Sequence, residues 1–119
     1  DIQYVSLIGD LEKSVDAVYS DASGSTYGLE EITIPNGIDE ICFVGTYESD
    51  VVNGLELDSR IQLIDDYNEA NLFFGGVELE HYRYKLDVII DGTICDNTKD
   101  RELNLILENM GRAVEITRL

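Results

Sequence analysis

Apolar side chains near the start of the chain recur at alternating steps of four and three residues, while polar side chains fill the positions between them. The apolar positions are Tyr4, Ile8, Leu11, Val15 and Val18. This spacing places them on one face of an α-helix, so we predict an amphipathic helix over residues 2–20. We expect this face to pack on the sheet of its own domain, and a helix that binds a separate partner is the alternative. Small polar residues and a glycine at 21–25 should end the helix.

After residue 26 the pattern changes to short runs rich in Ile, Val, Tyr and Phe, separated by Gly, Asn and Asp. Such runs are typical of β-strands. Residues 29–34 and 38–44 flank Pro35-Asn36-Gly37, a triplet suited to a tight turn, so we predict a hairpin there. Residues 47–59 form a polar stretch, which we interpret as a long connection.

Further strands are predicted in the second half of the chain, for a total of six to eight after the helix. Residues 61–64 and 72–74 are short apolar runs, and residues 82–90 alternate between apolar and polar positions. Asp91-Gly92 is a typical two-residue hairpin turn, and pairing through it would set Val88 opposite Cys95. A last hairpin is expected from the alternation of Leu103, Leu105 and Leu107, a turn at 109–111 and a final apolar run at 113–119.

This order of elements, one helix followed by strands without a βαβ rhythm, predicts an α+β fold with an antiparallel sheet. The chain has 119 residues, which is the size of one domain and is enough to bury a core. We therefore expect a single domain over 1–119, in which the helix at 2–20 precedes a β-rich head at 26–119.

The chain is strongly acidic, with 25 Asp and Glu residues against 8 Lys and Arg and a formal net charge of −17. Nucleic-acid binding depends on Lys and Arg that release counterions from phosphates, so nucleic acid is excluded as a partner class, and anionic membrane surfaces are disfavoured. Three interpretations of the acidity stay open: a solvated surface, adaptation to a salty medium, or binding of cations or basic partners.

Cys42 and Cys95 are the two cysteines of the chain, and they lie too far apart in sequence to form a C-x-x-C motif. Zinc and thioredoxin-like motifs are therefore unsupported. A disulfide between them would stabilise the fold by roughly 4 kcal/mol in the chain-entropy model. Two buried thiols are the alternative, and an extracellular location would favour the disulfide.

No motif for catalysis is present, since the chain contains no G-x-S-x-G sequence, Gly-rich phosphate loop or H-E-x-x-H sequence. The single histidine, His81, lies in a strand-like segment where a surface or packing role is expected. Carboxylate pairs such as Asp65-Asp66 are too common in so acidic a chain to indicate glycosidase chemistry. The sequence therefore predicts a protein that is not an enzyme.

Calcium is the cofactor that the composition could accommodate, because it takes six to eight oxygen ligands from loops rich in Asp, Asn and Glu. The first candidate set has oxygens at alternating positions: Asp96, Thr98, Asp100 and Glu102. It lacks the glycine and the final acid of an EF-hand loop. A looser set consists of Asp50, Asn53, Glu56 and Asp58. Solvated loops are the alternative for both sets.

A family resemblance is carried by three stretches of the chain, residues 29–45 (LEEITIPNGIDEICFVG), 71–76 (NLFFGG) and 103–119 (LNLILENMGRAVEITRL). They resemble small archaeal membrane-anchored surface proteins with a type IV pilin-like plan. In that plan a hydrophobic N-terminal helix inserts in the membrane or the filament core and continues as an amphipathic helix on a β-sheet head. The resemblance implies no catalytic residues.

The hydrophobic half of such a helix is not among these 119 residues, so the resemblance implies that about twenty apolar residues would precede Asp1. We therefore expect a pilin-like structural subunit at the cell surface or outside the cell. It would act through assembly with other copies or related subunits and through adhesion, and would contact a membrane only through the missing segment. A soluble acidic module that binds calcium or a protein is the competing hypothesis.

Overall fold

The computed structural model describes residues 2–46, 48, 51, 70–75 and 83–119, and its single described helix is α1 (Ile2–Tyr19). This helix begins where the apolar spacing predicts and ends one residue before the predicted end at residue 20. Ile8, Leu11, Val15 and Val18 of the predicted face are buried, Tyr4 is partly buried, and Leu7 extends the face. The helix ends before a turn in which Gly24 has a φ of 92°, a conformation that glycine adopts without steric cost.

The chain passes back and forth between two compact units. Unit 1 comprises residues 1–35, 87–89 and 100–119, and unit 2 comprises residues 36–86 and 90–99. The expectation of one domain over 1–119 stays a prediction.

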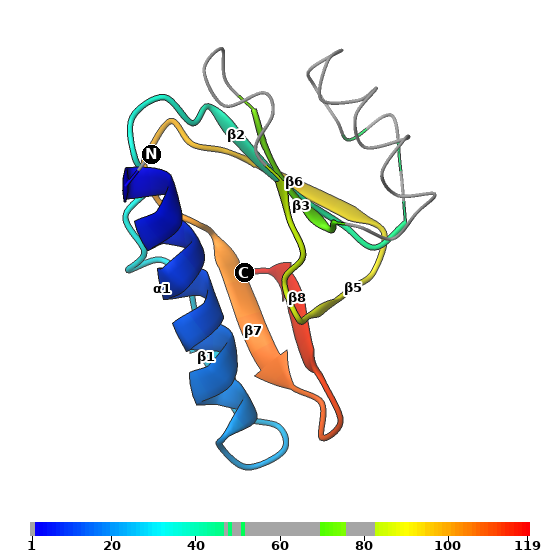
Figure 1. Cartoon of the computed structure of the whole chain (residues 1–119). Helices are drawn as coiled ribbons and strands as arrows, with labels where there is room; N and C mark the ends of the chain where they lie inside the picture. Colours follow the sequence, from blue (N-terminus) through cyan, green and yellow to red (C-terminus); the bar gives the residue numbers. More distant parts are fainter. Residues whose placement is uncertain (1, 47, 49–50, 52–69, 76–82) are drawn as a thin grey trace. The chain divides into compact units, whose positions relative to one another are not determined.

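In unit 1, α1 packs on antiparallel strands. The sheet has the order β1 (Thr26–Gly28), β7 (Leu105–Asn109), β8 (Val114–Arg118) and β5 (Ile89–Ile90). Of β5, Ile89 belongs to this unit. The strands β7 and β8 form the predicted C-terminal hairpin, with Leu107 opposite Ile116. The side chains of Leu103, Leu105, Leu107, Val114 and Ile116 are buried, and α1 contacts β7, β1 and β8 (Figure 1).

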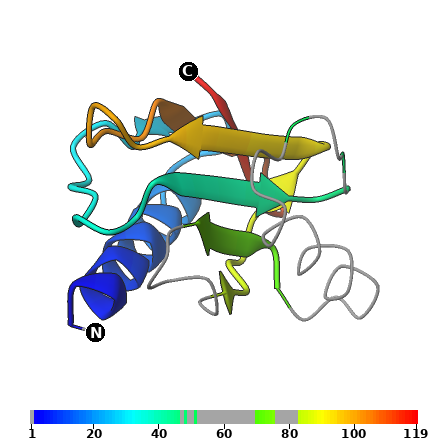
Figure 2. The same ribbon diagram turned by 90° about the horizontal axis from the view of Figure 1, so that it is seen from above.

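In unit 2, four antiparallel strands form the order β4 (Arg83–Tyr84), β3 (Leu72–Gly75), β2 (Glu40–Val44) and β6 (Thr93–Asn97). Figure 2 shows β3, β2 and β6 side by side. Every side chain of β2 is buried, as expected for a central strand covered on both faces. Cys42, Val44, Ala70, Phe73 and Cys95 form an apolar cluster against which Val51 packs.

The predicted hairpin between residues 29–34 and 38–44 is wrong. Strand β2 has β3 on one side and β6 on the other, so no edge is left for residues 29–34. The Leu29 amide instead donates to the Leu105 carbonyl beyond β1, and the Ile32 amide donates back to the Leu29 carbonyl in a turn. Leu29, Ile32 and Ile34 are buried without forming a strand. Gly37 has a φ of 96°, so the turn itself exists.

The predicted strand over 82–90 is also wrong in its described part, because residues 85–88 separate β4 from β5. The buried Asn71 side chain accounts for the break. Its Nδ2 donates to the Leu86 carbonyl at 2.7 Å and its Oδ1 accepts from the Leu86 amide at 2.7 Å. A side-chain amide thus takes both hydrogen bonds that a strand neighbour would supply to Leu86.

The turn at Asp91-Gly92 therefore does not close a hairpin, because β5 and β6 belong to different sheets. Gly92 has a φ of 73°, so the turn that Asp91-Gly92 predicts is present. Val88 does not lie opposite Cys95. The residue that pairs with Cys95 is Cys42.

The α+β class with antiparallel strands is confirmed. The predicted strand at 72–74 is present as β3, whereas the predicted strand at 61–64 and most of the connection at 47–59 lie outside the described residues. In the part of the chain that the structure describes, no helix has both the length and the apolar composition needed to span a bilayer.

Candidate functional site

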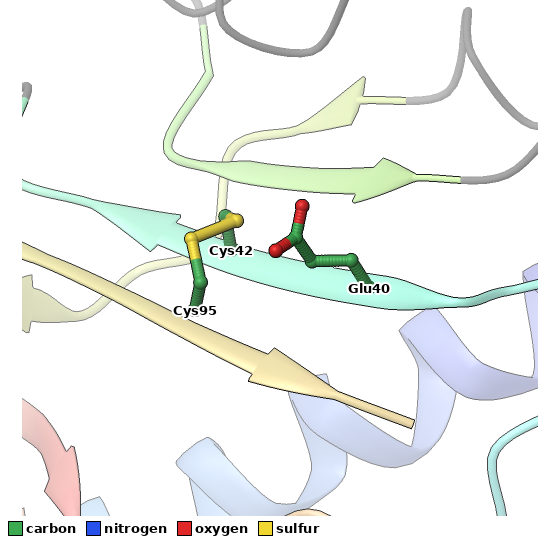
Figure 3. Close-up of side chains that lie close together, drawn as sticks. All are labelled: Glu40, Cys42 and Cys95. Atoms are coloured by element: carbon green, nitrogen blue, oxygen red, sulfur yellow. A yellow bond between two sulfur atoms is a disulfide. The ribbon is translucent and has the colours of Figure 1, made fainter. Parts of the chain in front are cut away.

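Unit 2 contains a disulfide that joins β2 to β6, the last strand in the order of its sheet. Cys42 on β2 and Cys95 on β6 lie directly opposite each other, with their Cα atoms 4.1 Å apart and their sulfurs bonded (Figure 3). The exposed fraction is 0% for Cys42 and 9% for Cys95. The disulfide that the sequence left open is thus present, and it crosslinks two strands that are 53 residues apart in sequence.

The carboxylate of Glu40 lies beside this disulfide. The sequence analysis did not identify Glu40 as a site residue. It lies two residues before Cys42, so both side chains project from the same face of β2. The side chain is 8% exposed, and one of its oxygens lies within 4.8 Å of both sulfurs. The sequence does contain one indication of this arrangement, an acidic residue two positions before a cysteine in a predicted strand. This indication is weak, because the chain has 25 acidic residues.

Two sulfurs and a carboxylate at this spacing form the kind of set that could hold a metal ion. Metal ions bind cysteine as the thiolate, and here the sulfurs are bonded to each other. The set therefore has a structural role in this state: the disulfide fixes the pairing of β2 with β6.

The Glu40 carboxylate should slow reduction of the disulfide. Thiol–disulfide exchange requires an anionic thiolate to approach one sulfur and releases a second thiolate from the other, and a nearby negative charge opposes both steps. We expect the Glu40→Gln variant to be reduced by dithiothreitol about tenfold faster, which corresponds to about 1.4 kcal/mol in the barrier. The rate of thiol release measures this effect.

Asp39→Asn is the matched control, because it removes one negative charge from the adjacent, exposed position before β2. Its reduction rate should stay close to that of the unaltered chain. Equal rates for Glu40→Gln and Asp39→Asn would show that Glu40 does not protect the disulfide.

The first candidate calcium set is divided between the two units. Asp96 and Thr98 belong to unit 2, where both are buried and the Thr98 hydroxyl donates to the Ile38 carbonyl. Asp100 and Glu102 belong to unit 1, where both are exposed. The second set, Asp50, Asn53, Glu56 and Asp58, lies outside the described residues, as does His81. Calcium binding stays a prediction.

Asp100 has both carboxylate oxygens hydrogen-bonded within its own turn. Its Oδ1 accepts from the Glu102 amide at 3.1 Å, and its Oδ2 accepts from the Asn104 side-chain amide at 3.3 Å. The bond from the Glu102 amide, followed by that from Asn104, lowers the Asp100 pKa below its ordinary value of 3.8. The turn is also held by Arg101, which has a φ of 59° and donates to the Pro35 carbonyl.

A lowered pKa in the folded state means that Asp100 favours folding above its unfolded pKa and that this contribution is lost as the pH falls through the folded value. We expect the Asp100 carboxyl to titrate below 3.8 in an NMR pH titration. In the Asn104→Ala variant the pKa should move upward, because one donor is removed. No upward movement would contradict a role for Asn104.

Asn109 is a residue in unit 1 that the sequence analysis treated only as part of a turn. It ends β7 with a side chain that is 4% exposed. Its Nδ2 lies 3.1 Å from the Val18 carbonyl, 3.2 Å from the Tyr19 carbonyl and 2.9 Å from the Asp21 carbonyl. The side chain thus donates to carbonyls at the last turn of α1 and just beyond it, and the Val18 carbonyl also accepts from the Asp21 amide.

Comparison with known protein families, with characterised proteins and with solved structures found no match to this chain.

Proposed function

We propose that this chain is a structural domain of a pilin-like surface protein, located at the cell surface or outside the cell. It acts through assembly with other copies or related subunits and through adhesion, without catalysis. The observation that carries the proposal is the disulfide buried between β2 and β6. Disulfides persist in secreted and surface proteins and are rare in reducing compartments.

Two further observations support this proposal. In unit 1 an amphipathic helix packs on an antiparallel sheet, which is the arrangement that the resemblance to pilin-like surface proteins implies. The net charge of −17 suits a protein that works in contact with solvent.

The oxidation state of Cys42 and Cys95 in the cells that make the protein tests this location. Living cells are treated with a membrane-permeant alkylating reagent, and the protein is then denatured, reduced and labelled with a second reagent. We expect both cysteines to carry only the second label. Two cysteines carrying the first label would show that the protein resides in a reducing compartment and would contradict the proposal.

The acidity favours a second candidate function, a module that binds calcium or a basic protein partner. A ligand that binds only the folded state raises the melting temperature with its concentration. A thermal melt at increasing calcium separates the two functions, with magnesium at equal ionic strength as the control. A calcium-specific rise would favour the binding module, and the structural domain predicts no rise.

A further inference from the structure

A small cavity in unit 1 carries charges of both signs. It has a volume of about 130 Å³ and is lined by Val15, Asp16, Tyr19, Asp87, Arg112, Ala113 and Val114. These residues come from the last turns of α1, from the segment before β5, from the β7–β8 turn and from the first position of β8. The hydrogen bonds of Asn109 to the end of α1 hold the helix end beside the β7–β8 turn (Figure 1). The Asn109 side chain therefore joins two of the segments that line the cavity.

The apolar part of the cavity comes from Val15 and Val114, which are 6% and 2% exposed. Tyr19 lines the same cavity and is 53% exposed. A large aromatic side chain left half in water beside a cavity offers contact area at a low entropic cost, since it has only two side-chain torsions. These three side chains could contact a short aliphatic group.

The charged part consists of the Asp16 and Asp87 carboxylates and the Arg112 guanidinium. All three residues are exposed. Among the residues that the structure describes, no hydrogen bond or ion pair engages the Arg112 side chain. Arg112 is thus a guanidinium without an ion-pair partner there, although the chain has three times as many acids as bases. A ligand that brought only a negative charge would face the net negative charge of the site, and one that brought only a positive charge would leave Arg112 unpaired.

We propose that this cavity binds a small zwitterion of the α-amino acid class. The ligand carboxylate pairs with Arg112, its ammonium group lies against Asp16 and Asp87, and its short side chain contacts Val15, Val114 and Tyr19. The volume corresponds to about four water molecules at roughly 30 Å³ each, which admits a small amino acid and excludes nucleotides and oligosaccharides. This binding is independent of the proposed function in assembly and adhesion.

L-Alanine is the probe, and binding is followed through the backbone amide NMR signals of Ala113, Val114 and Tyr19. We expect saturable shifts with a dissociation constant of about 1–10 mM, because the charge pairs lie at the protein surface. Propionate lacks the ammonium group and ethylamine lacks the carboxylate, so each should bind at least about tenfold more weakly, a loss of about 1.4 kcal/mol. Absence of saturable shifts with alanine, or equal binding of propionate or ethylamine, would overturn the proposal.

Variants test the assignment of each charge. Arg112→Gln should weaken alanine binding at least about tenfold, and Asp16→Asn combined with Asp87→Asn should do the same. Lys13→Gln is the matched control, because it removes an exposed positive charge from α1 outside the cavity and should leave binding unchanged. The spectra of the variants away from the cavity should overlay on that of the unaltered chain, which shows that they fold. Unchanged binding in Arg112→Gln would overturn the proposal.

Discussion

Replacing Cys42 and Cys95 by alanine should lower the free energy of unfolding by roughly 4 kcal/mol, because the disulfide closes a loop with a sequence separation of 53. In the chain-entropy model this crosslink restricts the unfolded chain. The alanine replacements also remove both sulfur atoms, which leaves a gap in the apolar cluster that Cys42 and Cys95 share with Val44 and Phe73. Urea unfolding followed by circular dichroism measures the change.

Reduction of the disulfide in the unaltered chain distinguishes the stability contributed by the covalent crosslink from that contributed by packing of the sulfur atoms. The reduced protein keeps both sulfurs in the cluster and loses only the covalent bond, so it should lose most of the same stability. If the reduced chain and the oxidised chain unfolded at the same urea concentration, the disulfide would not be the main constraint on unit 2.

Replacing Asn109 by alanine should lower the free energy of unfolding by roughly 2–3 kcal/mol, because buried polar groups lose a partner. The carbonyls of Tyr19 and Asp21 would lose the Asn109 side-chain donor, and the Val18 carbonyl would keep only the Asp21 amide. The Gly111 amide, which donates to Asn109 Oδ1 at 2.8 Å, would lose its acceptor. Thermal or urea unfolding measures the loss.

Two further variants test the reason for this effect. Asn109→Asp keeps the shape of the side chain but replaces the donor by a carboxylate at the negative end of the α1 dipole, so it should destabilise at least as much as alanine. A milder effect of aspartate would indicate that side-chain volume matters rather than the hydrogen bonds. Asn104→Ala makes the same substitution at an exposed site and should cost less than about 0.5 kcal/mol.

The sequence predicted the elements whose pairing is local. The apolar spacing from Tyr4 to Val18 determines a helix, and the alternation at Leu103, Leu105 and Leu107 determines a strand that pairs with the next strand through a short turn. Both signals depend on neighbours within a few residues. The same applies to the glycines that follow turn residues, such as Gly37 and Gly92.

Pairings between distant strands could not be predicted in the same way. Strand β2 pairs with β3 and β6, and β1 pairs with β7. The turn triplet at 35–37 and the apolar runs on either side of it predicted a local hairpin instead. The choice depends on which strand buries more apolar surface across the whole fold, and no local pattern encodes this.

The buried polar residues were missed for a related reason. Asn71 and Asn109 bind backbone groups 15 and 88–91 residues away, so nothing in their own segments indicates a partner. The two cysteines were noted as a pair, but their bond was decided by the register that sets Cys42 opposite Cys95. Glu40 could be identified as a site residue only from the structure, because the pairing of β2 with β6 places its carboxylate near both sulfurs.

Surface labelling of intact cells tests the proposed extracellular structural role most directly. The cells that make the protein are treated with a membrane-impermeant amine-reactive reagent, which can reach exposed lysines such as Lys13 and Lys99. We expect the protein to be labelled in intact cells to the same extent as in lysed cells, and a cytosolic protein of the same cells to be labelled only after lysis. Labelling of this chain only after lysis would contradict the proposal.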